Sequence, residues 1–294
     1  MAEHAVIDTG DTTIDVEFSG SGPAALLLHG FPETKRMWRD IAPLLAERFF
    51  VVCADLRGYG GSGTPASDAD HLPYSKRAMA GDVVAVMRRL GHDRFAIAGH
   101  DRGGRVAYRV ALDHPAVISR IAVLDVLPVD TVWEHADARM ALGFWPWSLL
   151  AQPEPLPERL IAAAPDAVID HALGPEWGSP AAAFPDEVRQ EYAAQLRDPA
   201  HLHAICEEYR AGAGIDRDHD AADRRAGRRI ECPLLALWSA PGPLSHWYGD
   251  LGGPLGVWRE LAEAVTGAPI AGGHFFPEEH PRRTAAALAE FFAA

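Results

Sequence analysis

A turn near residue 100 carries an aspartate that could act as a nucleophile. The apolar run Phe95–Ala98 leads directly into Gly99-x-Asp101-x-Gly103, and a stretch of helical length follows. Small residues two before and two after Asp101 permit a tight strand-to-helix turn that raises the central side chain into a pocket. A raised carboxylate can attack an sp³ carbon, displace a leaving group and form an alkyl ester. The alternative is an aspartate that only caps the helix; we favour the nucleophile.

An ester on Asp101 must be hydrolysed, which requires a base and a residue that orients the base. His274 follows two glycines and precedes the C-terminal helical stretch, and we expect it to be the base. Two acids could orient it: Asp125, which ends an apolar run, and Asp250, in the Pro- and Gly-rich stretch after the apolar run Leu234–Trp238. Because no acid follows that run directly, we favour Asp125.

Hydrolysis of the ester passes through an oxyanion, which needs two preorganised hydrogen-bond donors. The segment His29-Gly-Phe31-Pro follows an apolar run, and the main-chain N–H of Phe31 is the expected first donor. The main-chain N–H of Arg102, next to the nucleophile, is the expected second donor. The alternative is a simple turn at His29–Pro32.

Two arginines follow the nucleophile at the start of the same predicted helix. Arg102 and Arg105 lie three residues apart, so they occupy neighbouring helix faces. Two guanidinium groups beside Asp101 can clamp an anionic substrate. They could equally form a buried salt-bridge network that keeps Asp101 ionised. We favour the clamp.

The elements around these residues indicate an α/β fold. Alternating residues around Gly10-Asp11 predict a hairpin over residues 5–18. Apolar runs predict buried strands, and stretches of helical length separate them, which is typical of βα units with a parallel sheet. The expected strands are Ala24–Leu28, Phe50–Ala54, Phe95–Ala98, Ile121–Leu124 and Leu234–Trp238, with helices at Lys76–Leu90 and Gly103–Leu112.

Residues 130–227 have a different composition, with no apolar strand and with Trp, Ala, Pro and charged residues at helical spacings. We interpret this segment as a helical cap inserted after the sixth strand. It would then lie over the carboxyl ends of the strands, where open α/β sheets bind ligands. The expected division is a core over 1–129, the cap over 130–227, and the rest of the core, with His274, over 228–294.

Composition excludes several classes of function. Of 294 residues, 41 are acidic and 27 basic, and the net charge of −14 repels nucleic acids and anionic membranes. No apolar run approaches the roughly 18–20 residues that span a bilayer, and no signal peptide is evident. The three cysteines match no disulfide or metal spacing. We expect a cytoplasmic protein without metal or cofactor.

Two motifs resemble binding sites without their required context. Gly58–Gly63 matches GxGxxG, but the sequence continues as loop where a dinucleotide-binding fold needs a helix. Asp216, Asp218 and Asp220 resemble a calcium loop that lacks its glycine and its glutamate. We expect these aspartates to be solvated at a helix start and to pair with nearby arginines.

The assembled motifs resemble those of the fluoroacetate and haloacetate dehalogenases, which have the α/β-hydrolase fold, over nearly the whole chain. By that resemblance Asp101 is the nucleophile, His274 the base and Asp125 its partner. The stretches that carry the resemblance are His29–Glu33, Asp55–Gly60, Tyr74–Met79, Gly99–Arg105, Ala122–Asp125, Trp147–Gln152, Cys206–Gly212 and Gly273–Glu279.

The resemblance also implies how a substrate is held. Arg102 and Arg105 would bind the substrate carboxylate, and Trp147 and Tyr209 would donate hydrogen bonds to the departing halide. One position departs from the family: members that cleave fluoroacetate typically have His-Trp where this chain has Pro146-Trp147. Losing one preorganised donor typically costs about 10²–10³-fold in rate. We therefore expect chloro- and bromoacetate to be better substrates than fluoroacetate.

Two other functions fit part of the pattern. An epoxide hydrolase shares the aspartate nucleophile but needs cap tyrosines to protonate the opening ring, and only Tyr209 is well placed. Arg102 would serve no purpose toward a neutral epoxide. A small-acid receptor on a hydrolase scaffold would not need a complete catalytic set. The resemblance implies a homodimer with a small anionic haloacid as substrate.

Overall fold

The computed structural model describes residues 2–294, with side chains at all of these positions except 176 and 181. A single sheet of eight strands has the order β1-β2-β4-β3-β5-β6-β7-β8. β2 pairs antiparallel with β1 and with β4, and all pairs from β4 to β8 are parallel. The strands are β1 (Glu3–Asp8), β2 (Thr13–Gly20), β3 (Ala24–Leu28), β4 (Phe50–Ala54), β5 (Phe95–His100), β6 (Ile118–Leu124), β7 (Leu234–Ser239) and β8 (Val265–Ile270).

The predicted α/β class with a mostly parallel sheet is confirmed. The apolar runs at Ala24–Leu28 and Phe50–Ala54 form strands with the predicted bounds. The edge strand β8 was not predicted, because Gly267 and Pro269 interrupt its apolar pattern and much of it is exposed.

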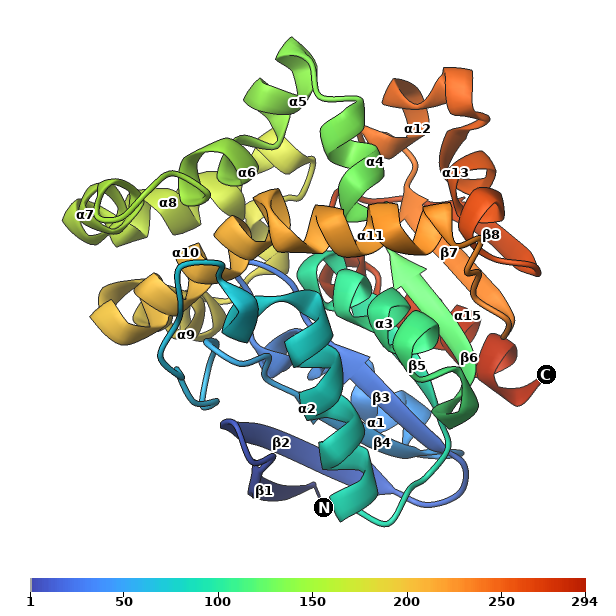
Figure 1. Cartoon of the computed structure of the whole chain (residues 1–294). Coiled ribbons are helices and arrows are strands. Elements are labelled where there is room, and N and C mark those ends of the chain that lie inside the picture. The colour runs from blue at the N-terminus through green and yellow to red at the C-terminus, as the bar shows by residue number, and fades with distance from the viewer. Residues whose placement is uncertain (1) are drawn as a thin grey trace.

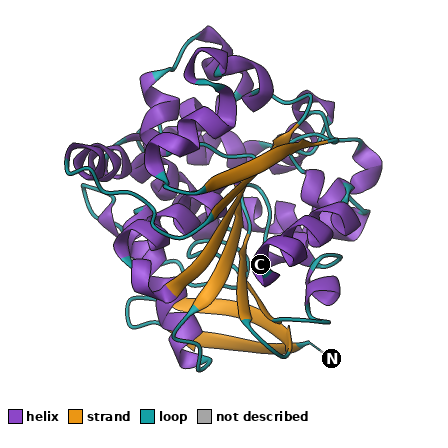
Figure 2. Ribbon diagram, turned by 90° about the vertical axis from the view of Figure 1, so that its right-hand side faces the viewer, coloured by secondary structure: helices purple, strands orange, loops and turns teal. Residues whose placement is uncertain are grey.

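Helices cover both faces of the sheet (Figure 2). Consecutive residues of β3 point to opposite faces, so Leu26 and Leu28 pack in one core, and Ala25 and Leu27 pack in the other. The core helices are η1 (Lys35–Trp38), α1 (Ala42–Leu45), η2 (Leu72–Tyr74), α2 (Lys76–Arg89), α3 (Asp101–Asp113), η3 (Pro115–Val117), α12 (Leu244–Trp247), η6 (Gly249–Leu251), α13 (Gly253–Leu261), α14 (Phe276–Glu279) and α15 (Pro281–Ala293).

Only helices and loops lie between β6 and β7 in the described part of the chain, and they extend over the end of the sheet where the parallel strands finish (Figure 1). The division of the chain into core and cap units stays a prediction. The helices of this segment are α4 (Val129–Glu134), α5 (Ala138–Gly143), α6 (Trp145–Leu150), α7 (Leu156–Ala163), α8 (Pro165–Ala172), η4 (Pro175–Trp177), η5 (Ala181–Ala183), α9 (Asp186–Arg197), α10 (Pro199–Ala213) and α11 (Ile215–Arg225).

Of the three aspartates of α11 for which we expect a solvated helix start, Asp218 is exposed, as expected, but the other two are not. Asp216 and Asp220 are buried, because they point toward the core instead of toward water. Asp220 accepts hydrogen bonds from Arg109 (2.5 Å) and from the hydroxyl of Tyr108 (2.7 Å), both on α3. Asp216 accepts the main-chain N–H of Lys76 at the start of α2 (2.8 Å). These aspartates fasten α11 to the core.

None of the helices within residues 2–294 is both long enough and apolar enough to cross a membrane. The glycines of 58–63 lead into a loop, as expected, and the next helical turn is η2.

Candidate active site

The turn between β5 and α3 raises Asp101, the first residue of the helix. Asp101 has φ +43°, in the left-handed region that side chains rarely adopt. A Cβ on Gly99 would lie 2.2 Å from the carbonyl oxygen of Gly103, and a Cβ on Gly103 would lie 2.4 Å from that of His29. The turn therefore requires both glycines.

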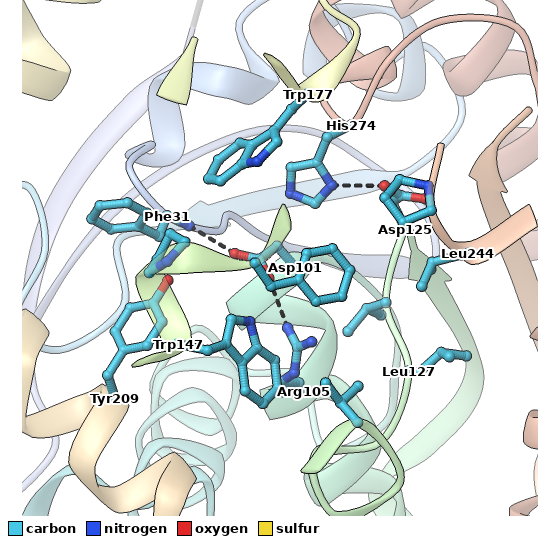
Figure 3. Close-up of a pocket in the computed structure, with 15 residues that line it drawn as sticks. Phe31, Asp101, Arg105, Asp125, Leu127, Trp147, Trp177, Tyr209, Leu244 and His274 are labelled. Atoms are coloured by element: carbon cyan, nitrogen blue, oxygen red, sulfur yellow. Dashed lines mark hydrogen bonds and ion pairs between the residues drawn. The ribbon is translucent and has the colours of Figure 1, made fainter. Parts of the chain in front are cut away.

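The two carboxylate oxygens of Asp101 have different partners (Figure 3). Oδ2 accepts the main-chain N–H of Phe31 (3.2 Å), and Oδ1 accepts Nη1–H of Arg105 (2.7 Å). Burial disfavours the charged carboxylate, but Arg105, and after it His274 and Arg102, outweigh burial and hold the pKa of Asp101 well below its usual range. Asp101 is therefore a carboxylate at neutral pH.

His274 is oriented by Asp125. Asp125 follows β6, and its Oδ2 lies 2.7 Å from Nδ1 of His274, while its Oδ1 accepts the main-chain N–H of Ser239 (2.8 Å). With Nδ1–H donated to Asp125, Nε2 of His274 is left as the basic nitrogen. Asp250 lies in η6 and lines other hollows of the surface. Geometry thus pairs His274 with Asp125.

Asp101 and His274 face a small cavity of about 50 Å³, measured as the space open to the centre of a water molecule. Such a space holds a few heavy atoms, since about 10–15 Å³ by this measure suffices for one water. The lining is mostly apolar, and its acidic and basic members are Asp101, Arg105, Asp125 and His274. Trp147 and Tyr209 lie on the opposite side of Asp101 from His274 (Figure 3).

The guanidinium of Arg105 has one hydrogen-bond donor without a partner. Its Nε is buried and has no partner. The ring of Trp147 covers the guanidinium, with 4.5 Å between the central carbon of the guanidinium and the ring centroid. An anion at this position would meet a desolvated positive charge.

Arg102 differs from our expectation that both guanidinium groups face the substrate. Its side chain is buried and donates from Nε and Nη2 to Glu208 of α10, with Nε 2.8 Å from each carboxylate oxygen. Lys76 binds the same carboxylate. Arg102 is absent from the cavity lining among the described residues and forms the buried ion pair that we had set as the alternative. A role for Arg102 or Arg105 in binding an anion stays a prediction.

Trp147, Tyr209 and Pro146 all line the cavity. Burial raises the pKa of Tyr209 well above its usual value, so its hydroxyl keeps the proton it would donate. Pro146 lies in the first turn of α6, where its fixed φ and missing N–H are compatible with the helix.

Two residues of this site were missed by sequence reasoning. Glu208 directly precedes Tyr209 in one of the family-like stretches, but nothing in the sequence indicates which cation it meets. Trp177, from η4, lines the cavity and contacts His274, with 5.6 Å between the two ring centroids. Trp177 lies in a segment that matches none of the motifs considered.

The main chain of Trp177 also touches the loop that carries the base. Its carbonyl accepts the main-chain N–H of His274 (2.9 Å). A Cβ on Gly273 would lie 2.4 Å from the main-chain carbon of Gly178, so the two chains pass without room for a side chain. Ser179 donates to Glu279 beside the same loop (2.5 Å).

Among the described residues, no group of three or more His, Cys, Asp or Glu side chains is arranged to hold a metal ion. The acidic and basic side chains of the cavity are instead Asp101, the pair of His274 with Asp125, and Arg105.

Comparison with known proteins identifies the family to which this fold belongs. The family model described as "alpha/beta hydrolase fold" matches residues 23–281. The chain therefore belongs to the α/β-hydrolase family.

Within that family, the chain is 45% identical over 290 residues to a fluoroacetate dehalogenase from Burkholderia sp, with 98% of this chain and 93% of the relative covered. It is 31% identical to a soluble epoxide hydrolase from Corynebacterium sp. (strain C12), covering 94% and 92%. A solved structure from Nostoc sp PCC 7120, described as an alpha/beta hydrolase, superposes with a TM-score of 0.94 at 43% identity, covering 99% and 97%. The resemblance to the dehalogenases is confirmed.

Proposed function

We propose that this protein hydrolyses haloacetates to glycolate and halide through an alkyl ester on Asp101. The observation that carries the proposal is the pairing of an ionised, buried Asp101 with Arg105 in a cavity sized for a few heavy atoms. The 45% identity to a fluoroacetate dehalogenase over nearly the full chain supports the same reaction.

In the first step, Oδ1 of Asp101 attacks the carbon that bears the halogen, and the halide leaves with the bonding electrons. The substrate carboxylate takes the place of Oδ1 on Arg105, which has an unused Nε–H. Trp147 Nε1–H and Tyr209 O–H are the proposed donors to the halide. The guanidinium of Arg102, paired with Glu208, lies over the ring of Tyr209, 4.0 Å from its centroid.

In the second step, Nε2 of His274 takes a proton from water, and the hydroxide attacks the carboxyl carbon of Asp101. The ester carbonyl oxygen is Oδ2, which already accepts the N–H of Phe31; the main-chain N–H of Arg102 is the proposed second donor. Asp125 stabilises the imidazolium that forms. As the intermediate collapses, the bond from the Asp101 carboxyl carbon to the alkoxide oxygen breaks, and the His274 imidazolium gives its proton to that oxygen to release glycolate. The Asp101 carboxylic acid then loses its proton to solvent, which restores the carboxylate.

An epoxide hydrolase is the second candidate, supported by the 31% identity to such an enzyme. It is less well supported, because Tyr209 is the only tyrosine in the cavity lining within the described part of the chain and Arg105 presents a positive charge. A non-catalytic receptor has no specific observation in its favour. We also infer a cytoplasmic homodimer from the resemblance; light scattering of the purified protein tests the dimer.

Halide release from bromo-, chloro- and fluoroacetate tests the proposed function, with epoxide opening as the comparison. Asp101→Asn should abolish halide release, because a neutral amide lacks the attacking oxygen. His274→Asn should still release one halide per site and then accumulate an ester, visible by mass spectrometry on the peptide containing residue 101. Full activity of a sequence-verified, non-deamidated Asp101→Asn protein would refute the mechanism.

A further inference from the structure

A chain of three buried ionisable groups lies behind the base and takes no direct part in the reaction above. Glu33, His100 and Glu278 come from the loop after β3, the end of β5 and α14, and all are buried. His100 lies against the ring of His274, with 4.6 Å between the ring centroids. Burying three ionisable groups side by side is costly unless they share protons and hydrogen bonds.

Both ring nitrogens of His100 face oxygen atoms. Nδ1 lies 2.9 Å from Oε2 of Glu33, and Nε2 lies 2.9 Å from the main-chain carbonyl of His274. A carbonyl can only accept, and a neutral imidazole has one N–H. If Glu33 is ionised, His100 must therefore be an imidazolium to satisfy both contacts.

The second carboxyl oxygen of each glutamate indicates that this cluster holds another proton besides those on His100. Oε1 of Glu33 and Oε2 of Glu278 are both buried and have no partner, which is costly for charged oxygens. The other oxygens are occupied: Oε2 of Glu33 accepts Gly30 N–H (3.1 Å), and Oε1 of Glu278 accepts Arg39 and the Tyr192 hydroxyl (3.1 Å). The carboxyl groups of Glu33 and Glu278 lie within hydrogen-bonding reach of each other. One proton between them would therefore satisfy both orphaned oxygens.

We propose that Glu33, His100 and Glu278 form one buried proton-sharing unit whose His100 donates to the main chain of His274, and that the three are positioning residues for ester hydrolysis. In this unit a protonated Glu278 donates to ionised Glu33, which accepts from the His100 imidazolium. The proposal rests on the proposed function, since it concerns the second step of that reaction.

The electrostatics of the surroundings agree with this distribution of protons. Burial, followed by the negative charge of Glu33, raises the pKa of Glu278 to about 8, against the opposing effect of Arg39. Burial lowers the pKa of His100, but Glu33 outweighs burial and raises it to about 9. The groups that face the unit are Arg39 beside η1, Tyr192 of α9, His29 after β3, and Asp101, Asp125 and His274 of the site.

A consequence is an alkaline limit on the hydrolysis step. Glu278 lies four residues after His274, so its ionisation places two repelling carboxylates under the loop that carries the base. Arg39 and Tyr192 both have raised pKa values and keep their protons in that range. His100, with a pKa of about 9, titrates above Glu278, with a pKa of about 8, so the first loss of rate should belong to Glu278.

The test uses Glu278→Gln, whose amide can donate to Glu33 without titrating. Ester hydrolysis, followed as decay of the Asp101 adduct after a single halide burst, should retain its neutral rate. Its alkaline limb should move up by about one pH unit, to the range in which His100 titrates. The burst itself should keep its pH profile. The matched control is Glu207→Gln. Glu207 is another buried glutamate, but it lies in α10 away from His274, so this substitution should leave the alkaline limb in place.

Glu33→Gln should slow adduct decay at least tenfold while the halide burst survives, because His100 loses its anionic partner. Infrared spectroscopy of the unmodified parent provides a readout independent of activity. A protonated buried carboxyl band should be present at neutral pH, disappear at alkaline pH and be missing in Glu278→Gln. Absence of that band from the parent, or an alkaline limb that Glu278→Gln leaves unmoved, overturns the proposal. A parent that releases no halide but shows the band would instead refute the proposed function.

Discussion

Arg105 brings a positive charge to the wall of the cavity. Its guanidinium is desolvated, holds Oδ1 of Asp101 and keeps an unpartnered Nε–H. Removing it should therefore affect carboxylate substrates more than neutral ones, because each charge-assisted hydrogen bond contributes about 1.5–3 kcal/mol.

Arg105→Leu should lower kcat/KM for chloroacetate about tenfold or more and raise the preference for chloroacetamide. The ratio of the two kcat/KM values, measured in parent and variant, checks this. An equal fall for both substrates would assign Arg105 to the structure of the site instead of to substrate binding.

Pro146 determines how many hydrogen-bond donors face the departing halide. Charge concentrates most on a departing fluorine, so cleavage of C–F needs a third donor more than cleavage of C–Cl does. No histidine of the inserted helices lines the cavity within the described residues. Of the five, His135, His201 and His203 hydrogen-bond instead to Thr131, Gly58 and Glu158.

Pro146→His should raise kcat/KM for fluoroacetate relative to chloroacetate. The first turn of α6 accepts a residue other than proline, since the substitution restores an N–H at a position that needs no helical partner. The test is that ratio of kcat/KM values in the two proteins. A parent that already favours fluoroacetate would show that two donors suffice.

Sequence reasoning singles out Asp101, Phe31, Asp125 and His274 because each follows an apolar run or a glycine pair within three residues. The carboxyl ends of parallel strands meet at one edge, so such residues are expected to lie together. It could not place the Arg102 side chain, because a guanidinium can turn toward the cavity or toward Glu208. That choice depends on α10, which is 106 residues away in sequence. Local patterns do not encode such a pairing.

At the scale of elements, α11 is held to the core by buried charge. Arg109 of α3 binds both Asp220 and Asp223, and burial raises the pKa of Asp220 to about 6 despite that arginine. An acid whose folded pKa lies above its unfolded value binds protons more tightly when folded, so its ionisation opposes folding. Stability from this group is lost as pH rises from about 4 to about 6.

Asp220→Asn should therefore become more stable relative to the parent as pH rises through that window, by on the order of 2 kcal/mol. Free energies of unfolding from urea titrations of both proteins at pH 4.5 and pH 7 measure the change. A difference between the proteins that stays constant with pH would mean that Asp220 is ionised at both pH values.

The apolar runs predicted the strands closely because both faces of the sheet are buried. Periodicity could not reveal that α11 buries its acidic face. A row of aspartates has the same pattern whether it faces water or arginines, and the partner arginine lies on α3, more than 100 residues earlier.

The whole molecule carries a net charge of −14, yet its proposed substrate is an anion. Distant surface charges are screened by salt more strongly than a buried arginine close to the substrate. Added salt should thus relieve repulsion while leaving the attraction to Arg105 largely intact.

We expect kcat/KM for chloroacetate to rise about two- to threefold between low and physiological ionic strength, while that for neutral chloroacetamide stays constant. Steady-state rates across a sodium sulfate series, which adds no competing halide, provide the comparison. A fall in kcat/KM for chloroacetate would show that salt also screens the attraction between Arg105 and the substrate.

The close passage of Gly178 and Gly273 limits how relatives of this enzyme can be recombined. The turn at 177–179 supplies a carbonyl to His274 and a hydroxyl to Glu279, so the inserted helices and the base loop share one interface. A chimeric enzyme that receives the helical insert of a relative would place a different surface against its own His274 loop. Grafts should therefore exchange residues 177–179 and 273–279 as a matched pair.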